Sequence, residues 1–173
     1  MFESDLSILL RVVIAMLLTG ILGWERESAG KAAGIRTHML VGIGSVLFVA
    51  LGEIFVLRFD HNDQSMRFDP IRIVEAVVTA IGFIGAGTIF VNRGKHTVKG
   101  LTTAASIWTT AAVGMIVGLE RYFLAAASTV IIFIILRLVT FLEAGKIKPH
   151  EKKRSRRKRK GRELNLVPFK PFP

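Results

Sequence analysis

Five long apolar runs, separated by polar connections, constrain this chain of 173 residues more than any other feature. A helix needs about 20 mostly apolar residues to cross a bilayer. The windows that meet this requirement are Leu6–Gly23, Met39–Leu57, Ile71–Val91, Leu101–Leu119 and Tyr122–Leu142. Buried helices of a soluble domain are the weaker interpretation, because the connections supply too little polar surface to coat one. The sequence therefore predicts an all-α integral membrane protein, a compact bundle of five transmembrane helices.

The lysines and arginines predict the orientation of this bundle. The connections at 24–38 and 92–100 each hold three basic residues, whereas the connection at 58–70 balances two arginines with three aspartates. Basic residues in short connections mark the cytoplasmic side of a membrane protein. We therefore expect the N-terminus outside and the C-terminus in the cytoplasm, in the bacterial inner membrane.

The charge is concentrated at the end of the chain. Residues 1–143 carry a net charge of +1, and residues 144–173 carry +10. This predicts a five-span transmembrane domain at 1–143 and a basic, disordered cytoplasmic tail at 144–173, too short and too charged to fold alone. A basic cluster next to a membrane is attracted to anionic lipids by about 1 kcal/mol per charge. Lipid contact is favoured over nucleic acid, and a simple topology signal is the further alternative.

The start of the chain and its lack of cysteine exclude other classes. There is no cysteine, so disulfides and thiolate metal sites are excluded. The acidic opening MFESD and the charge at Arg11 do not fit a cleaved signal peptide. We expect the first apolar run to stay in the mature protein.

Small residues recur where helices should touch. One face of the fourth span holds Thr103, Ser106, Thr110 and Gly114, and one face of the third holds Glu75, Thr79, Gly82 and Ala86. Helices in lipid associate through close backbone approach and hydrogen bonds. The glycines assigned to packing, within the bundle or between copies, are Gly82, Gly85, Gly87, Gly114 and Gly118. Packing is favoured over a polar conduit.

Two groups of charged residues lie at opposite ends of the spans. Arg11, Glu53, Arg72 and Glu75 all fall within roughly 8 Å of the expected outer boundary. They are candidates for a functional charge cluster in the membrane, with snorkelling to the headgroups as the equal alternative.

The other group lies at the expected cytoplasmic face. Its members are Glu25, Arg26, Glu27, Lys31, Arg36, Thr37, His38, Thr102 and Thr103. Helix starts with free N–H groups could bind an anion there, and carboxylates with a histidine could hold a divalent cation weakly. A salt-bridge network that fixes the connection is the alternative. No nucleophile–base pattern emerges, so we assign no catalytic residue, resident metal or cofactor.

Three segments carry a family resemblance. GWERESAGKAAGIRTHMLVGIGS, IGFIGAGTIF and KGLTTAASIWTTAAVG resemble, in order, the MgtC/SapB family of bacterial inner-membrane proteins over about residues 10 to 140. The positions that match the family's motifs are Glu25, Arg26, Glu27, Lys31, Gly34, Arg36, Thr37, His38, Gly82, Gly85, Gly87, Gly100, Leu101, Thr102, Thr103, Ala104 and Trp108.

The resemblance implies a bundle of about five transmembrane helices. Its virulence-associated branch is tied to growth at low magnesium and to restraint of the proton-driven ATP synthase, and it continues into a soluble C-terminal domain where this chain has the basic tail. We expect a regulator of magnesium or ion homeostasis, or of membrane energetics, that acts through a membrane partner. The alternatives are a small magnesium transporter or channel that uses Glu75, and a structural module that forms homo-oligomers.

Overall fold

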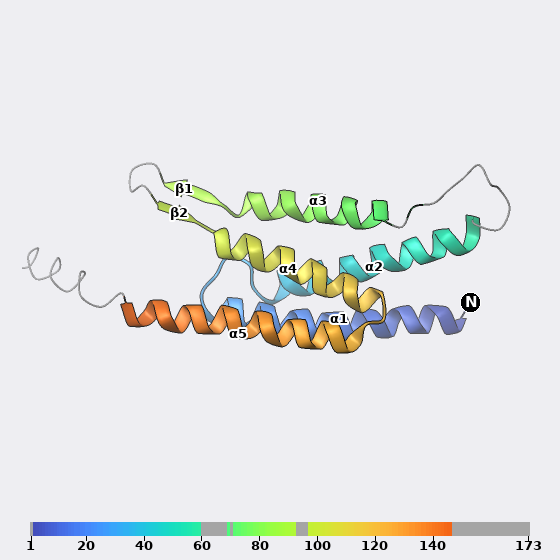
Figure 1. Ribbon diagram of the computed structural model, residues 1–173, viewed down its shortest axis with the longest axis horizontal. Helices are drawn as coiled ribbons and strands as arrows, with labels where there is room; N and C mark the ends of the chain where they lie inside the picture. Colours follow the sequence, from blue (N-terminus) through green and yellow to red (C-terminus); the bar gives the residue numbers. More distant parts are fainter. Residues whose placement is uncertain (1, 60–68, 70, 93–96, 147–173) are drawn as a thin grey trace, which may run out of the picture. The chain divides into compact units, whose positions relative to one another are not determined.

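The computed structural model describes residues 2–59, 69, 71–92 and 97–146, with side chains for 5–57, 69, 71–91 and 97–138. The basic tail from residue 147 lies outside the described residues. Five helices and one short hairpin form the described part (Figure 1). They are α1 (Phe2–Ser28), α2 (Ile35–Phe59), α3 (Ile71–Gly87), β1 (Phe90–Asn92), β2 (Thr97–Lys99), α4 (Leu101–Gly118) and α5 (Tyr122–Lys146).

Three stretches are long and apolar enough to cross a membrane: Asp5–Ser28, Ile35–Leu57 and Leu101–Gly118. In α5 the apolar stretch with described side chains is shorter, Tyr122–Leu138. α3 has 17 residues. At 1.5 Å per residue this is about 26 Å, slightly less than the ~30 Å hydrocarbon core of a bilayer. The predicted class, a mostly helical membrane protein, is confirmed at this level.

The third helix ends earlier than predicted. α3 stops at Gly87, and the strand that follows pairs antiparallel with β2, with Val91 opposite Val98. Threonine, isoleucine, valine and phenylalanine dominate this stretch and favour extended backbone. The predicted span Ile71–Val91 is therefore too long, and the fold is all-α except for this hairpin.

Gly100 joins the hairpin to α4. Its φ is 93°, and a Cβ atom there would lie 1.9 Å from the carbonyl oxygen of Thr88. Both the left-handed backbone and the close approach require glycine.

The interior is built mainly where α2 packs against α1 and α4. The buried apolar cluster between these helices and α5 consists of Ala15, Val46, Val113, Val117 and Ala125. A Cβ atom on Gly114 would lie 2.6 Å from the carbonyl oxygen of Gly42, and one on Gly118 would lie 2.8 Å from Cβ of Val49. These two glycines therefore pack against α2 within the chain, in line with the close approach expected of helices in lipid.

α3 packs differently from the expectation. It contacts α4 and, less extensively, α2, and its buried residues are Val77, Ile81 and Gly85. The face expected to make helix contacts, with Glu75, Thr79, Gly82 and Ala86, is exposed instead. The regular spacing showed that these residues share a face, but spacing alone does not tell which face turns toward the chain's own bundle.

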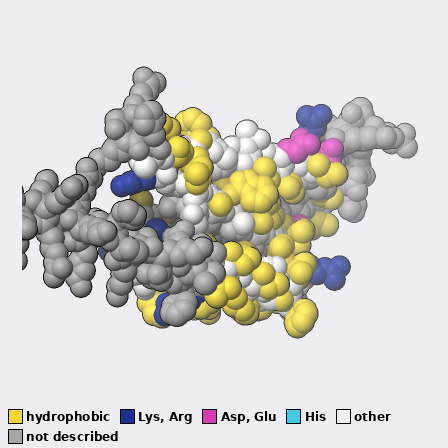
Figure 2. All heavy atoms as spheres, turned by 60° about the vertical axis from the view of Figure 1, so that its left-hand side comes forward, with side chains coloured by type: hydrophobic (Ala, Val, Ile, Leu, Met, Phe, Trp, Pro, Cys, Tyr) yellow, Lys and Arg dark blue, Asp and Glu magenta, His cyan; other side chains and the backbone are white. Residues whose placement is uncertain are grey.

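Large apolar side chains cover much of the surface. Leu6, Leu9, Leu17, Phe123 and Ile134 are all more than half exposed, and Phe123 is 89% exposed. Figure 2 shows hydrophobic side chains in the middle of the visible face and charged side chains toward its edges. An apolar surface this extensive is typical of helices that face lipid.

Candidate functional site

Two polar clusters lie toward opposite ends of α1, each around one buried arginine. We call them the Arg26 cluster (Glu25, Arg26, His38 and Ser106) and the Arg11 cluster (Arg11, Glu53 and Glu120). The first contains several of the residues expected at the cytoplasmic face. The second contains two of the four expected outer charges.

The end of α1 sets the geometry of the Arg26 cluster. Gly30 has a φ of 65°, and Lys31 N–H donates to the carbonyl of Arg26 at 3.0 Å, which closes the helix with a Schellman-type turn. Glu27 reaches across this turn, and its carboxylate accepts the Ile35 N–H at the start of α2 at 3.0 Å. A carboxylate at a helix N-terminus is favourable, so Glu27 helps to fix the junction between the two helices.

Arg26 and Glu25 form a buried ion pair. Nε of Arg26 donates to Oε2 of Glu25, and Nη2 forms an ion pair with the same oxygen. Nη2 also donates to the carbonyl oxygen of Leu136 in α5 at 3.2 Å. The exposed fractions of Arg26 and Glu25 are 1% and 2%. The positive charge is therefore compensated inside the chain, and the pair links α1 to α5.

His38 links α2 to α4 through a chain of hydrogen bonds. Its Nδ1 lies 2.9 Å from the carbonyl oxygen of Gly34, and its Nε2 lies 3.3 Å from Oγ of Ser106. Since a carbonyl oxygen only accepts, Nδ1 must carry a proton. Ser106 also donates to the carbonyl of Thr103 at 2.8 Å. The hydroxyl of Ser106 has one proton, which it can donate either to the Thr103 carbonyl or to Nε2 of a neutral His38. The protonation state of His38 therefore decides which of these hydrogen bonds forms.

The other residues expected at this face divide by exposure. Lys31, Arg36 and Thr102 are exposed, Thr37 is half-buried and Thr103 is buried. The buried members serve the junction, and the exposed ones are free for contact with another molecule. In the described part of the chain, no three His, Asp or Glu side chains come together as a metal site.

In the Arg11 cluster one guanidinium serves three partners. Nη1 of Arg11 donates to Oε2 of Glu53 at 2.7 Å and to the carbonyl oxygen of Gly118 at 2.9 Å, and Nη2 lies 2.5 Å from Oε1 of Glu120. Its side chain is 10% exposed, against 42% for Glu53 and 52% for Glu120. Of the four charges expected to cluster near the outer boundary, Arg11 and Glu53 form an ion pair.

Two expected members are absent from this cluster, and one unexpected member is present. Arg72 and Glu75 are exposed on α3 and pair with neither Arg11 nor Glu53 in the described structure. Glu120 was missed because it lies outside the apolar runs. It has a φ of 60°, and its N–H and that of Arg121 close the end of α4 on the carbonyls of Val117 and Ile116. Glycine is favoured at a position with positive φ. The glutamate at this position, in the sequence GLER, was therefore the feature that could have indicated a specific role for Glu120.

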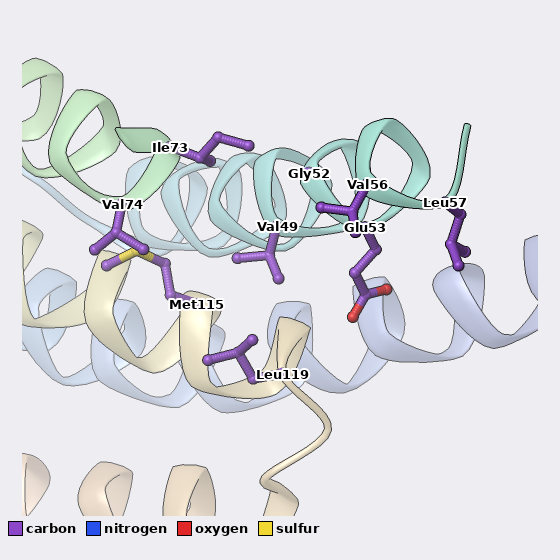
Figure 3. Close-up of a pocket in the computed structure, with 9 residues that line it drawn as sticks. All are labelled: Val49, Gly52, Glu53, Val56, Leu57, Ile73, Val74, Met115 and Leu119. Carbon is purple, nitrogen blue, oxygen red and sulfur yellow. The ribbon is translucent and has the colours of Figure 1, made fainter. Parts of the chain in front are cut away.

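A cavity of about 440 Å³ adjoins Glu53 between α2, α3 and α4. It is lined by Val49, Gly52, Glu53, Val56, Leu57, Ile73, Val74, Met115 and Leu119. Figure 3 shows that apolar side chains surround it and that the Glu53 carboxylate turns toward α1, where it meets Arg11. This lining suits an apolar molecule better than a hydrated ion.

Comparison with known proteins places the chain in a family. Residues 12–144 match the MgtC family. The chain belongs to this family. It is 43% identical to the putative magnesium transporter YhiD of Escherichia coli K12 over 133 residues, which cover 75% of this chain and 59% of YhiD. It is 38% identical to protein MgtC of Brucella abortus over 125 residues, which cover 72% of this chain and 48% of that protein.

A further relative is protein SrpB of Synechococcus elongatus, 36% identical over 120 residues, which cover 65% of this chain and 64% of SrpB. The chain thus spans between about half and two thirds of the length of these relatives. No solved structure matches the chain. The family match covers the Arg26 cluster and begins one residue after Arg11.

The Arg26 cluster predicts unequal effects of two similar substitutions. Glu25→Gln leaves the buried Arg26 guanidinium uncompensated, and we expect it to lower the free energy of unfolding by about 3 kcal/mol. Glu27→Gln keeps an oxygen acceptor for Ile35 at an exposed position, and we expect a change within about 0.5 kcal/mol. Unfolding in mixed micelles, with abundance in membranes as a second measure, checks this. Equal losses for the two variants would contradict the assignment.

The Arg11 cluster predicts a rescue. Arg11→Leu leaves two carboxylates without their cation, and we expect a loss of about 1–3 kcal/mol, below that of a fully buried pair because both carboxylates are about half exposed. Combining Arg11→Leu with Glu53→Gln and Glu120→Gln removes the surplus negative charge and should recover part of the loss. The same unfolding measurement compares the two proteins. A triple variant no more stable than the single one would show that the carboxylates do not depend on Arg11.

Proposed function

We propose that this chain is a regulatory protein of the bacterial inner membrane that influences magnesium homeostasis or membrane energetics through a partner. The observation that carries the proposal is that the buried side chains of Arg26 and His38 are bound to other groups of the bundle. Arg26 is held by Glu25 and Leu136, and His38 by Gly34 and Ser106. Such a framework holds helices in place, whereas an ion pathway needs polar groups that are free to replace hydration water.

The buried polar face of α4, with Thr103, Ser106 and Thr110, supports the same conclusion, and we call it the α4 stripe. The hydroxyl of Thr110 donates to the carbonyl of Ser106 in α4 at 2.7 Å. On the neighbouring helices, Thr19 of α1 donates to the carbonyl of Ala15 at 2.7 Å, and Ser45 of α2 donates to that of Val41 at 2.9 Å. These hydroxyls serve their own helix backbones, so the stripe permits close packing and does not form a conduit.

The exposed side chains beside the Arg26 cluster are the proposed contact surface. Lys31 lies directly after the turn at Gly30, and Arg36 lies in the first turn of α2. Both are exposed, while the junction beneath them is held by buried pairs. A partner bound there would act on the connection between α1 and α2. The family resemblance points to the proton-driven ATP synthase as such a partner.

Transport of magnesium is the second candidate, because the E. coli relative YhiD is named as a magnesium transporter. In this chain Glu53, the acidic residue that lines the cavity, is already bound to Arg11. A carboxylate neutralised by a guanidinium is a poor ligand for a hard divalent cation. This favours the regulatory function.

The orientation is part of the proposal: five spans, with the N-terminus outside and the C-terminus in the cytoplasm. Reporter fusions after Leu57 and Arg121 should report outside, and fusions after Lys31, Lys95 and Lys160 should report inside, because of the lysine and arginine asymmetry. An external report from Lys160 would contradict the five-span arrangement.

The contact surface predicts loss of function without loss of fold. Lys31→Glu with Arg36→Glu reverses two exposed charges and should abolish activity in a low-magnesium growth or membrane-potential assay, while abundance stays near that of the wild type. Arg121→Glu, an exposed arginine after α4, is the matched control and should keep activity. Full activity of the double variant at normal abundance would refute the proposed surface.

A further inference from the structure

The face of α3 that turns away from α4 is unlike the other exposed faces of the chain. Val77, Ile81 and Gly85 are buried, and the opposite side of the helix is exposed. That side carries Arg72, Glu75, Thr79, Gly82 and Ala86, and also Phe83, which is 83% exposed. We call it the α3 outer face. The four residues from Glu75 to Ala86 in the first group are spaced by four, three and four positions, which aligns them along one side of a helix.

This composition is poorly suited to lipid. On α1 and α5 the exposed positions are large and apolar, such as Leu9, Leu17 and Ile134. On the α3 outer face, by contrast, a carboxylate and a guanidinium are exposed and form no ion pair within the described structure. The hydroxyl of Thr79 donates to the backbone carbonyl of Glu75 at 2.8 Å, so it leaves the carboxylate free. A charged side chain in a membrane either reaches the headgroups or pairs with an opposite charge, and within the described residues Arg72 and Glu75 have no such pair.

The same face also allows a close approach. A Cβ atom built on Gly82 meets nothing within 4 Å, and Ala86 lies four residues further along the same side. Small residues at this spacing let two helix backbones come close enough to gain packing energy in a membrane. Among the described residues, no helix packs against Gly82.

We propose that the α3 outer face binds the same face of a second copy of this chain. The charges argue for self-association, because each copy presents one cation and one anion three residues apart. A two-fold axis along the membrane normal brings Arg72 of each copy toward Glu75 of the other. These two residues differ in depth by about 4.5 Å, and their side chains are long enough to span this distance. A partner that brought charge of one sign would leave the other charge unpaired.

Cross-linking tests the contact directly, since the chain contains no cysteine. Gly82→Cys and Ala86→Cys, each as the sole cysteine, should give disulfide-linked dimers when the full chain is oxidised in its native membrane. Ile134→Cys is the control, because it is exposed on α5 at a similar distance from the start of its helix, and it should remain monomeric. Absence of dimers from both α3 variants, or equal dimer yield from the control, would overturn the proposal.

A charge exchange distinguishes contacts between copies from contacts within one copy. In the Ala86→Cys protein, Arg72→Glu makes both positions acidic and Glu75→Arg makes both basic. Each variant alone should lose about tenfold in dimer yield, as expected when two partly screened ion pairs become repulsive. Differently tagged, the two variants expressed together should form the mixed dimer at the wild-type yield.

The mixed dimer decides the outcome. If the mixture forms no more dimer than either variant alone, or if each variant alone dimerises as well as the wild type, the proposed pairing is wrong. Cross-linking of Ala86→Cys to a different membrane protein in place of a second copy would also overturn it. The comparison of Gly82→Cys with Ile134→Cys stays valid even if a charge variant fails to accumulate.

Discussion

The bundle depends on how closely α2 and α4 approach each other. Lipid supplies no hydrophobic force between helices, so their association relies on packing and hydrogen bonds. At Gly114 an added Cβ atom would meet the carbonyl of Gly42 at 2.6 Å, and at Gly118 it would meet Val49. With these two backbones in contact, Val46, Val113 and Val117 can form a common core with α1 and α5. The polar clusters are then held at fixed positions around this contact.

The two buried arginines fasten opposite ends of α1 to the rest of the bundle. Arg11 joins α1 to α2 through Glu53, and to the end of α4 through the Gly118 carbonyl and Glu120. Arg26 joins α1 to α5 through the Leu136 carbonyl. Each guanidinium has several donors in a fixed geometry, so one side chain can link more than two elements. Lys31, Arg36, Arg72 and Glu75 are exposed and take no part in either cluster, so they can contact other molecules.

Much of this arrangement could be predicted from the sequence. The apolar runs placed all five helices, and the shared depth of Arg11 and Glu53 put both in one expected charge cluster. The small-residue periodicity of α4 correctly identified its buried face, at Thr103, Ser106 and Thr110. These features are local, or follow from alternating helix direction across a membrane.

The remaining features depend on tertiary contacts that periodicity cannot reveal. The same periodicity on α3 marked a face that turns away from the bundle, because a second face, with Val77 and Ile81, packs against α4. Hydropathy gave no reason to end α3 at Gly87, since the strand residues that follow are as apolar as a helix in lipid. Glu120 reaches Arg11 because a left-handed turn after α4 directs it there. The functional assignment of the Arg26 cluster and the exposed residues around it stays a prediction.

We propose that the chain regulates a partner and does not conduct ions, because the polar groups of its bundle are bound within the bundle. Uptake of magnesium into sealed vesicles reconstituted with the purified full chain tests it most directly, with a magnesium ionophore to establish that uptake is detectable. The account predicts uptake equal to that of protein-free vesicles at every external magnesium concentration. Saturable uptake that increases with the amount of protein, and is lost in the Glu53→Gln variant, would contradict it.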